Sequence, residues 1–402
     1  MRRFICIVSA FTLLLAGCVK NEPLTSGGQE PKAEIAFESP ILGPKTKSVA
    51  EYAAYPDHLD FNVLAFYSEG EDPEFGKKDT ENEEQNNNRM LGQYIDDARF
   101  SKAEGSNVWE AFGDKKYYWP HSGYLHFVAY APAEARSHIS RVLVTNYGLL
   151  LTHYNVPDAA NEDLMVSRFV LSQTRPEVQE EAVPLLFDHV LASLTFNVRS
   201  GIYGDRTVDD PNRVDTDLRI KKIEVRGVYA EANFSQFMSP PWTDELVEGR
   251  SSWRWLDYND DVVKNFTAFN GTSSKLTGDY QPIHDRVLST DEEEYLSLTN
   301  LMLLPQAIPA DAFLRVTYDV THSNLDEING GENVWVEDLV TEVPLQDCGI
   351  LMWNCGYRYT YNLTLYLDRI ECTTDVEQWV DVYESVTNDD FVSNPLDWVV
   401  TD

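Results

Sequence analysis

Hydrophobic and polar residues alternate strictly along one stretch near the end of the chain, from Tyr357 to Ile370. One set of alternate positions is aromatic or aliphatic: Tyr357, Tyr359, Tyr361, Leu363, Leu365 and Leu367. The positions between them are mostly polar: Arg358, Thr360, Asn362, Thr364, Tyr366 and Asp368. A period of two is typical of a β-strand with one buried face, so the stretch predicts a long strand within a large sheet. Just before it, Asn354-Cys355-Gly356 is a turn signal typical of the start of a hairpin.

The same alternation, or a short apolar run bounded by turn residues, recurs along the chain. It predicts strands over residues 33–42, 60–67, 107–120, 123–131, 194–198, 220–228, 298–305, 312–320 and 333–345. Pro40 restricts the first of these to an edge or terminal position, because proline has no N–H for a central ladder. The short turn His121-Ser122 joins the third strand to the fourth. Helical patterns of usual length are scarce, so we expect an all-β fold built of β-sandwiches.

The length of the chain indicates more than one domain. At 402 residues it exceeds what one hydrophobic core usually serves, so two domains are expected. The acidic segment 175–183, which carries Pro176, separates two halves with different patterns. We therefore expect an N-terminal β-sandwich domain over residues 33–180 and a C-terminal one over residues 181–382, followed by a tail over residues 383–402.

The first residues form an export signal. Arg2 and Arg3 precede an apolar run that is too short to span a bilayer, and small residues lead up to Cys18. This end resembles a bacterial lipobox, which implies that residues 1–17 are removed and that Cys18 is lipidated. Each buried methylene of an acyl chain contributes about 0.8 kcal/mol, so two or three chains hold a protein at a membrane. Residues 18–32 are polar and contain Gly and Pro, as a flexible tether does. The alternative is an ordinary signal peptide with an incidental cysteine.

The net charge of the chain limits the kinds of partner that it can bind. The chain has 66 acidic and 32 basic residues, for a formal net charge of -34. Such a surface repels phosphate backbones, so we expect no nucleic-acid partner. It also disfavours docking to anionic lipid headgroups.

Three cysteines follow Cys18 in the chain, namely Cys348, Cys355 and Cys372. Export permits a disulfide, and Cys348 and Cys355 flank a short apolar loop in which one can form. Three thiols cannot all pair, and the simpler interpretation is that at least one is buried as a small hydrophobic group. No CxxC pair or His/Cys spacing indicates zinc.

The motifs of common active sites are absent from the sequence. HExxH, GxSxG, GxxxxGK and GxGxxG do not occur. His189 follows Asp188, as a base follows its orienting acid, but no Ser or Cys is placed beside them as a nucleophile, so we interpret His189 as structural. His121 and His126 would face opposite sides of a strand and make a poor metal pair. Acidic clusters do not follow the calcium-loop pattern. We therefore expect no catalytic residue, no metal site and no cofactor.

Several segments together resemble the fimbrillin-like lipoproteins of Bacteroidales, in the Mfa-like group. They are the lipobox, an early strand followed by a Thr-Lys loop, DFNVLAFY, YYWPHSGYLHFVAYAP, LLFDHVLASLTFNV and YRYTYNLTLYLDRIECTTDVEQW. The resemblance covers roughly residues 33–380. It implies a non-enzymatic component of a type V pilus (fimbria), located at the cell outer membrane and in the surface pilus, with two tandem transthyretin-like β-sandwich domains.

The resemblance also implies proteolytic processing. Family members are trimmed by a trypsin-like protease after a basic residue near the first strand, which opens a groove for a terminal segment of another subunit. The matching positions here are Lys45 and Lys47. The best-known members use arginine at this point, and this chain has none between Arg3 and Arg89. The alternative is a solvated loop that is not cut, with the first strand left in place, as in an anchor subunit.

The C-terminal tail offers the donor segment. Its apolar points include Phe391, Val392, Leu396, Trp398 and Val400. A strand added to an open sheet edge gains ladder hydrogen bonds and buries alternate side chains. The tail either binds in this way to a neighbour or folds back on its own domain.

We therefore expect a structural or accessory pilus subunit that exchanges strands with other pilus subunits and supports adhesion. One alternative is a surface glycan-binding lipoprotein of a polysaccharide-uptake system, for which exposed Trp242, Trp253 or Trp255 would line a shallow groove. Another is a lipid-anchored hydrolase, which needs two carboxylates that converge in a cleft.

Overall fold

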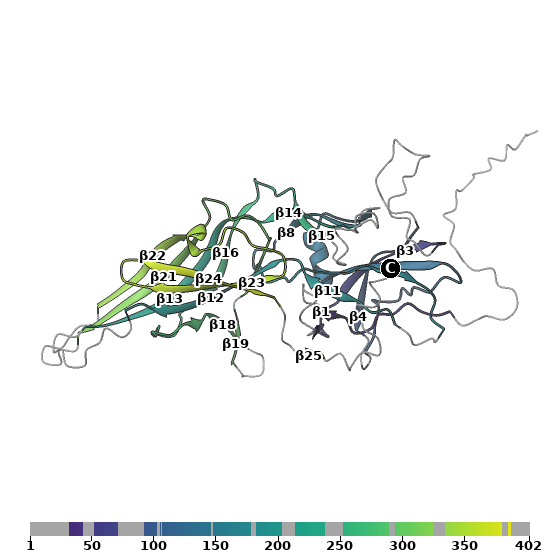
Figure 1. The fold of residues 1–402 in the computed structure, drawn as a ribbon. Coiled ribbons are helices and arrows are strands. Elements are labelled where there is room, and N and C mark those ends of the chain that lie inside the picture. Colours follow the sequence, from purple (N-terminus) through teal and green to yellow (C-terminus); the bar gives the residue numbers. More distant parts are fainter. Residues whose placement is uncertain are drawn as a thin grey trace, which may run out of the picture.

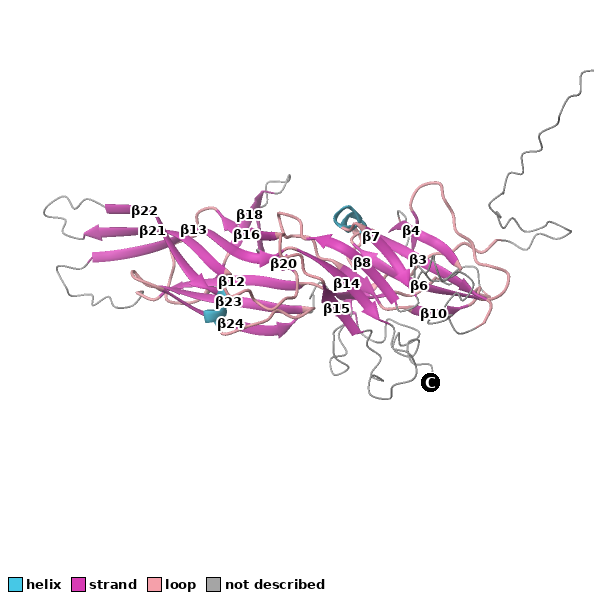
Figure 2. Ribbon diagram, turned by 90° about the horizontal axis from the view of Figure 1, so that it is seen from above, coloured by secondary structure: helices cyan, strands magenta, loops and turns pink. Residues whose placement is uncertain are grey.

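The described part of the chain is almost entirely β-structure, so the predicted all-β class is confirmed. The computed structural model describes residues 32–42, 52–70, 92–102, 105, 107–145, 148–177, 182–202, 214–237, 252–288, 294–298, 300–324, 334–379 and 385–386. The molecule is elongated, with one group of sheets towards each end (Figure 1). The same division is visible from above (Figure 2).

One end of the molecule is built around a ten-stranded sheet with the order β25-β2-β1-β11-β9-β6-β3-β4-β5, in which β10 also pairs with β6. Its strands are β1 (Ile41–Leu42), β2 (Tyr52–Ala54), β3 (Phe61–Ser68), β4 (Gln93–Lys102), β5 (Trp109–Ala111), β6 (Tyr124–Ala131), β9 (Met165–Ser167), β10 (Val170–Gln173), β11 (Leu186–His189) and β25 (Ser385–Val386). A four-stranded sheet with the order β15-β14-β8-β7 accompanies it. Its strands are β7 (Arg141–Thr145), β8 (Gly148–Asn155), β14 (Glu231–Phe237) and β15 (Ser252–Leu256).

The other end contains a five-stranded sheet, in the order β17-β12-β23-β24 with β20 on β12, and a four-stranded sheet in the order β16-β13-β21-β22. The five strands are β12 (Ala192–Ser200), β17 (Gln281–Pro282), β20 (Leu301–Leu303), β23 (Tyr357–Leu365) and β24 (Ile370–Gln378). The four are β13 (Val214–Tyr229), β16 (Val263–Asn270), β21 (Phe313–Asn324) and β22 (Val334–Pro344). A separate hairpin pairs β18 (His284–Leu288) with β19 (Glu294–Leu298).

Among the described residues, the strands are accompanied by the 3₁₀ turns η2 (Ala133–His138) and η4 (Leu345–Cys348). Within the described ranges, no helix has the length and apolar character needed to cross a membrane.

The central strands of the ten-stranded sheet are buried on both faces. In β3, Phe61 and Val63 point into one hydrophobic core, whereas Leu64 and Phe66 point into a second core that continues through the rest of the molecule. Both faces of β6 are buried in the same way. A strand covered on both sides has no need of polar residues at alternate positions, which is why DFNVLAFY is nearly uniformly apolar.

The long strand predicted from Tyr357 to Ile370 is shorter than expected. β23 ends at Leu365, and the main-chain N–H of Tyr366 donates to the carbonyl of Arg369 at 2.9 Å, which turns the chain into β24. Leu367 therefore lies in this turn and is 50% exposed, so its predicted place on the buried face is wrong. The turn predicted before the strand is confirmed, because Gly356 adopts φ +64°, a conformation that favours glycine.

The hairpin predicted between residues 107–120 and 123–131 does not form. β5 is short and pairs with β4. The chain after it, at Tyr117 and Trp119, hydrogen-bonds instead to the segment that begins at Ala33. The alternating pattern was correct for an extended chain, but it could not show which partner the chain would take.

Strand pairing crosses the division predicted at residues 180 and 181. β11 pairs with β1 and β9 in the ten-stranded sheet, although it follows that division. The later hairpin β14–β15 pairs with β8. The N-terminal sheets thus take three segments from the later part of the chain, because β25 also pairs with β2. The division into residues 33–180 and 181–382, and the transthyretin-like layout of each half, stay predictions.

Candidate functional site: the first segment and its groove

The first segment of the described chain, residues 33–42, lies inside the ten-stranded sheet, not at its edge. Its Ile41 and Leu42 pair with β11 on one side and with β2 on the other. Phe37 forms bridges to both Trp109 and Val183. Of the two positions predicted from Pro40, the edge is wrong, whereas the end of a strand is correct, because β1 begins directly after it at Ile41. The proline lies between these two short pairings, where no ladder N–H is needed, and its carbonyl accepts from the N–H of Tyr55 at 3.2 Å.

Main-chain hydrogen bonds hold the first segment on both sides. On the β5 side they join Ile35 N to Tyr117 O (2.8 Å), Phe37 N to Trp109 O (3.0 Å), Trp109 N to Phe37 O (2.8 Å) and Trp119 N to Ala33 O (2.9 Å). On the β11 side they join Val183 N to Ala36 O (2.8 Å), Glu38 N to Val183 O (3.0 Å) and Ile41 N to Leu185 O (3.1 Å). Because β5 and β11 are otherwise connected only through β4, β3, β6 and β9, the first segment closes this sheet on itself.

The side chains of the first segment alternate as the sequence predicted. Ala33, Ile35 and Phe37 are buried in the core of the closed sheet, whereas Glu34 and Ala36 are partly exposed. Alternate residues of AEIAF thus face the core, as expected for a strand with one covered face.

Phe37 lies at the centre of an aromatic cluster. Its ring makes edge-to-face contacts with Phe61, Phe100 and Phe127, with centroid separations of 5.8, 4.9 and 5.5 Å. All four rings are fully buried. Edge-to-face geometry is a preferred arrangement of aromatic pairs, so Phe37 fits a preformed slot in the core.

Most site residues predicted from the sequence lie outside the described residues. These are Cys18, Lys45, Lys47, Phe391, Val392, Leu396, Trp398 and Val400. Their roles therefore stay predictions. The tail enters the structure only as β25, where Val386 pairs with Tyr52 and Ser385 with Ala53. This short piece of the tail folds back on its own chain beside the strand that flanks Ile41 and Leu42.

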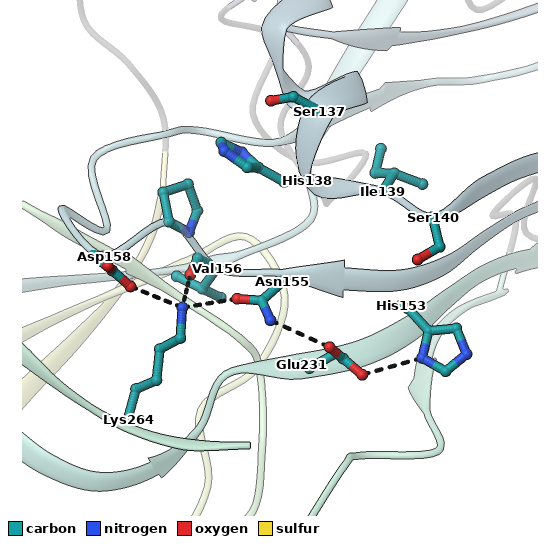
Figure 3. Close-up of a pocket in the computed structure, with 11 residues that line it drawn as sticks. Ser137, His138, Ile139, Ser140, His153, Asn155, Val156, Asp158, Glu231 and Lys264 are labelled. Carbon is teal, nitrogen blue, oxygen red and sulfur yellow. Dashed lines mark hydrogen bonds and ion pairs between the residues drawn. The ribbon is translucent and has the colours of Figure 1, made fainter. Parts of the chain in front are cut away.

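A polar hollow of about 490 Å³ lies beside η2 and takes its lining from β8, β14 and β16 (Figure 3). Glu231 is at its centre and accepts from Asn155 Nδ2 at 3.2 Å, while His153 Nδ1 lies 3.1 Å from its other oxygen. Lys264 Nζ donates to Asn155 Oδ1 at 2.8 Å and to Asp158 Oδ1 at 2.9 Å. The polar groups of the hollow are thus largely bonded to one another.

Two carboxyl groups of the hollow have lowered pKa values. The hydrogen bond from Asn259 is the main reason for the low pKa of Glu231, helped by those from His153 and Asn155. The hydrogen bond and the charge of Lys264 lower the pKa of Asp158. Both carboxylates are therefore held ionised at neutral pH, which does not suit a general acid. The residues of this hollow come from three distant parts of the sequence, and no local pattern marked them.

His189 is a packed residue, as the sequence analysis interpreted it. Its side chain is buried, its ring stacks on Trp379 with centroids 3.9 Å apart, and its Nδ1 lies 2.8 Å from Asp163 Oδ2. The neighbouring Asp188 is instead bound by Arg168, with Nε to Oδ2 at 2.9 Å. The sequence suggested a pairing of His189 with Asp188, whereas alternation along β11 sends the two side chains to opposite faces. Arg168 and Trp379 were not identified from the sequence.

The other predicted histidines and tryptophans are placed as follows. His126 is buried, with its Nε2 2.7 Å from Ser68 Oγ, whereas His121 is exposed. The part of the chain that the structure describes contains no cluster of His, Cys, Asp and Glu able to hold a metal ion. Trp255 is buried and donates its indole N–H to the carbonyl of Val190 at 2.7 Å. Trp242 and the side chain of Trp253 lie outside the described residues.

Comparison with solved structures matches this chain to fimbrial proteins of two bacterial species. A fimbrial protein from Bacteroides vulgatus is 13% identical, with a TM-score of 0.50, and the match covers 86% of this chain and 100% of that one. The tip fimbrial protein Mfa3 from Porphyromonas gingivalis is also 13% identical, with a TM-score of 0.33 and coverage of 86% and 100%. The first likeness shows a shared fold.

Comparison of the sequence with curated proteins gave no match. A family model described as fimbrillin-like matches residues 75–379, which is well over half of the chain. The protein therefore belongs to the fimbrillin-like family.

Proposed function

We propose that this protein is a structural or accessory subunit of a cell-surface pilus and that it assembles by strand exchange. The observation that carries the proposal is the first segment, residues 33–42, which closes a sheet from within by main-chain bonds on both sides. Membership of the fimbrillin-like family supports it independently.

Release of the first segment would leave a well-defined groove. Two rows of main-chain N–H and C=O groups, on β5 and before β11, would lose their partners beside an apolar slot. Such an edge is a template for another strand. The four larger side chains of the segment, Ile35, Phe37, Ile41 and Leu42, are almost completely buried. At about 1.5–3 kcal/mol each, their burial is worth on the order of 6–12 kcal/mol, which a donor strand of the same pattern would recover.

A burial free energy of this size means that the chain must be cut before the first segment can be exchanged for a donor strand. A segment held this firmly does not leave while the chain after it is intact, because it rebinds intramolecularly at a high effective concentration. Cleavage after Lys45 or Lys47, shortly beyond Leu42, would convert it into a separable peptide. A chain that is not cut would keep the segment and stay at the outer membrane through lipidated Cys18, as an anchor.

The donor in this proposal is the tail of another subunit. Phe391, Val392, Leu396, Trp398 and Val400 supply apolar side chains for the slot. The resulting filament would carry adhesion to host or bacterial surfaces.

The buried position of Trp255 removes one of the three tryptophans expected to form a sugar platform. An exposed tryptophan was the expected mark of a sugar platform, and this indole is 7% exposed and bonded to the main chain. The polar hollow has no aromatic residue among its described lining residues, whereas sugar sites commonly stack the ring on one.

N-terminal sequencing of the protein isolated from surface filaments tests the proposal. We expect mature chains to start at Thr46 or Ser48. The double variant Lys45→Gln/Lys47→Gln should start at Cys18 and be lost from filaments. The control Lys77→Gln/Lys78→Gln, which removes the same charge further along the chain, should behave as the wild type.

A second measurement separates processing from exchange. The variant Trp398→Asp/Val400→Asp should be processed normally but should not polymerise, because aspartate cannot enter an apolar slot at low cost. Processed wild-type protein that stays monomeric at every concentration, or filaments built of chains that start at Cys18, would refute the proposal.

A further inference from the structure

The thiols of Cys348 and Cys372 lie next to one another in the fold. Cys348 ends η4 and is fully buried, and Cys372 is on β24, the edge strand of its sheet. Both thiols belong to one hydrophobic core, because Cys348 is a member of it and the partly buried Cys372 packs against it. Both thiols also lie near the buried hydroxyl of Tyr361.

The main chain around the two thiols is held in register independently. Thr374 lies two residues after Cys372 in β24, so the two side chains share one face of the strand. The hydroxyl of Thr374 donates to the carbonyl oxygen of Cys348 at 2.9 Å. On the partner strand, Leu363 lies opposite Cys372 and is buried in the same core as Cys348. The inward face of β24 is thus fixed against the end of η4 at this point.

The third thiol has different neighbours. Cys355 is partly buried and lies near the hydroxyls of Tyr258 and Tyr359. The pairing suggested by the sequence, Cys348 with Cys355 across a short loop, therefore has a competitor that only the tertiary structure reveals.

We propose that Cys348 and Cys372 form a disulfide in the exported protein. An S–S bond forms between the two Sγ atoms, and the two thiols give up two protons and two electrons. The electrons reduce the disulfide of an exported thiol–disulfide oxidant to two thiols, through a mixed disulfide with Cys372, which is the more accessible of the pair. The bond ties β24 to η4 and so fixes the last described strand before the C-terminal tail.

The environment of Cys372 indicates when the proposed disulfide forms. The hydrogen bond with Cys348, together with burial, raises the pKa of Cys372. Thiol–disulfide exchange needs the thiolate, so the folded, reduced pair reacts slowly and the bond forms while the chain is still folding after export.

A mechanical consequence rests on the proposed pilus function. If the tail joins subunits and β25 is released from β2, tension along a filament enters each subunit through β24. A covalent bond at Cys372 passes that tension to η4 and prevents β24 from peeling off the sheet edge.

Alkylation of the exported, full-length protein under denaturing conditions tests the bond. Without reductant, iodoacetamide should label Cys355 and leave Cys348 and Cys372 unlabelled, and mass spectrometry should find one peptide pair that joins them. After reduction, all three should be labelled. Label on both Cys348 and Cys372 without reductant, or a bond to Cys355, would overturn the proposal.

Variants supply the matched comparison. Reductant should lower the melting temperature of the wild type and of Cys355→Ser, and should leave those of Cys348→Ser and Cys372→Ser unchanged. Equal sensitivity of all four proteins to reductant would also overturn it. Neither measurement depends on polymerisation, so a failure of the bond is distinguishable from a failure of the pilus function.

Discussion

Truncation of Phe37 to alanine tests whether the first segment is held by its aromatic anchor. The ring is completely buried and makes three edge-to-face contacts, with Phe61, Phe100 and Phe127. Alanine keeps the main-chain hydrogen bonds to Trp109 and removes the ring alone. The change therefore isolates side-chain packing from strand pairing.

The expected loss of stability in Phe37→Ala follows from these contacts. Burial of a phenylalanine is worth about 1.5–3 kcal/mol, and each aromatic pair adds about 0.5–1.5 kcal/mol. Truncations of buried phenylalanine cost about 3–5 kcal/mol, which lies within the resulting sum. If the cost falls on local release of the first segment, its open population rises roughly a hundred-fold to a few thousand-fold, at ten-fold for each 1.4 kcal/mol.

Amide hydrogen exchange is the suitable assay because it reports local opening. Phe37→Ala should speed exchange at Ile35 and Trp109 by this factor, relative to the wild type. The control is Phe112→Ala, which removes a ring that is 60% exposed and lies 5.0 Å from the Arg99 guanidinium. Its cost should not exceed about 1 kcal/mol. If the two variants showed the same exchange rates, the first segment would not be anchored by Phe37.

Two further predictions concern charged groups. Arg168→Met should lower the free energy of unfolding by about 3–5 kcal/mol, because it leaves the carboxylate of Asp188, which is 1% exposed, without its ion-pair partner. Urea denaturation measures this loss, and a loss below about 1 kcal/mol would contradict a buried ion pair. The hydrogen bond from Asn259 is the main reason that the pKa of Glu231 is lowered in the folded protein. The contribution of Glu231 to stability is therefore complete above its pKa in the unfolded chain, about 4.3, and is lost as the pH falls through its lower pKa in the folded protein. Glu231→Gln should therefore weaken the loss of stability on acidification, in urea melts at neutral and acidic pH, whereas the exposed control Glu342→Gln should not.

Part of the candidate site could be predicted from the sequence. The alternation in AEIAF placed Ile35 and Phe37 on one face, and both are buried side by side in the core of the closed sheet. Of the two positions inferred from Pro40, the edge was wrong and the end of a strand was correct, because the ladder is interrupted at that residue and β1 begins directly after it. The Arg168–Asp188 pair and the contact of Thr374 with Cys348 left no local signal, since each joins residues from separate elements.

The sequence by itself determined the all-β class, the strands that have one covered face and the turn at Gly356. These features depend on the period of the side chains and on local main-chain conformation, which neighbouring residues decide. Only the tertiary structure decided that residues 33–42 lie between β5 and β11, that β14 and β15 join the sheet of β8, and that β24 packs against η4. The physical reason is that every extended segment offers the same main-chain donors and acceptors. Which of them pair depends on the edges that the rest of the chain leaves open, and that is a property of the whole fold.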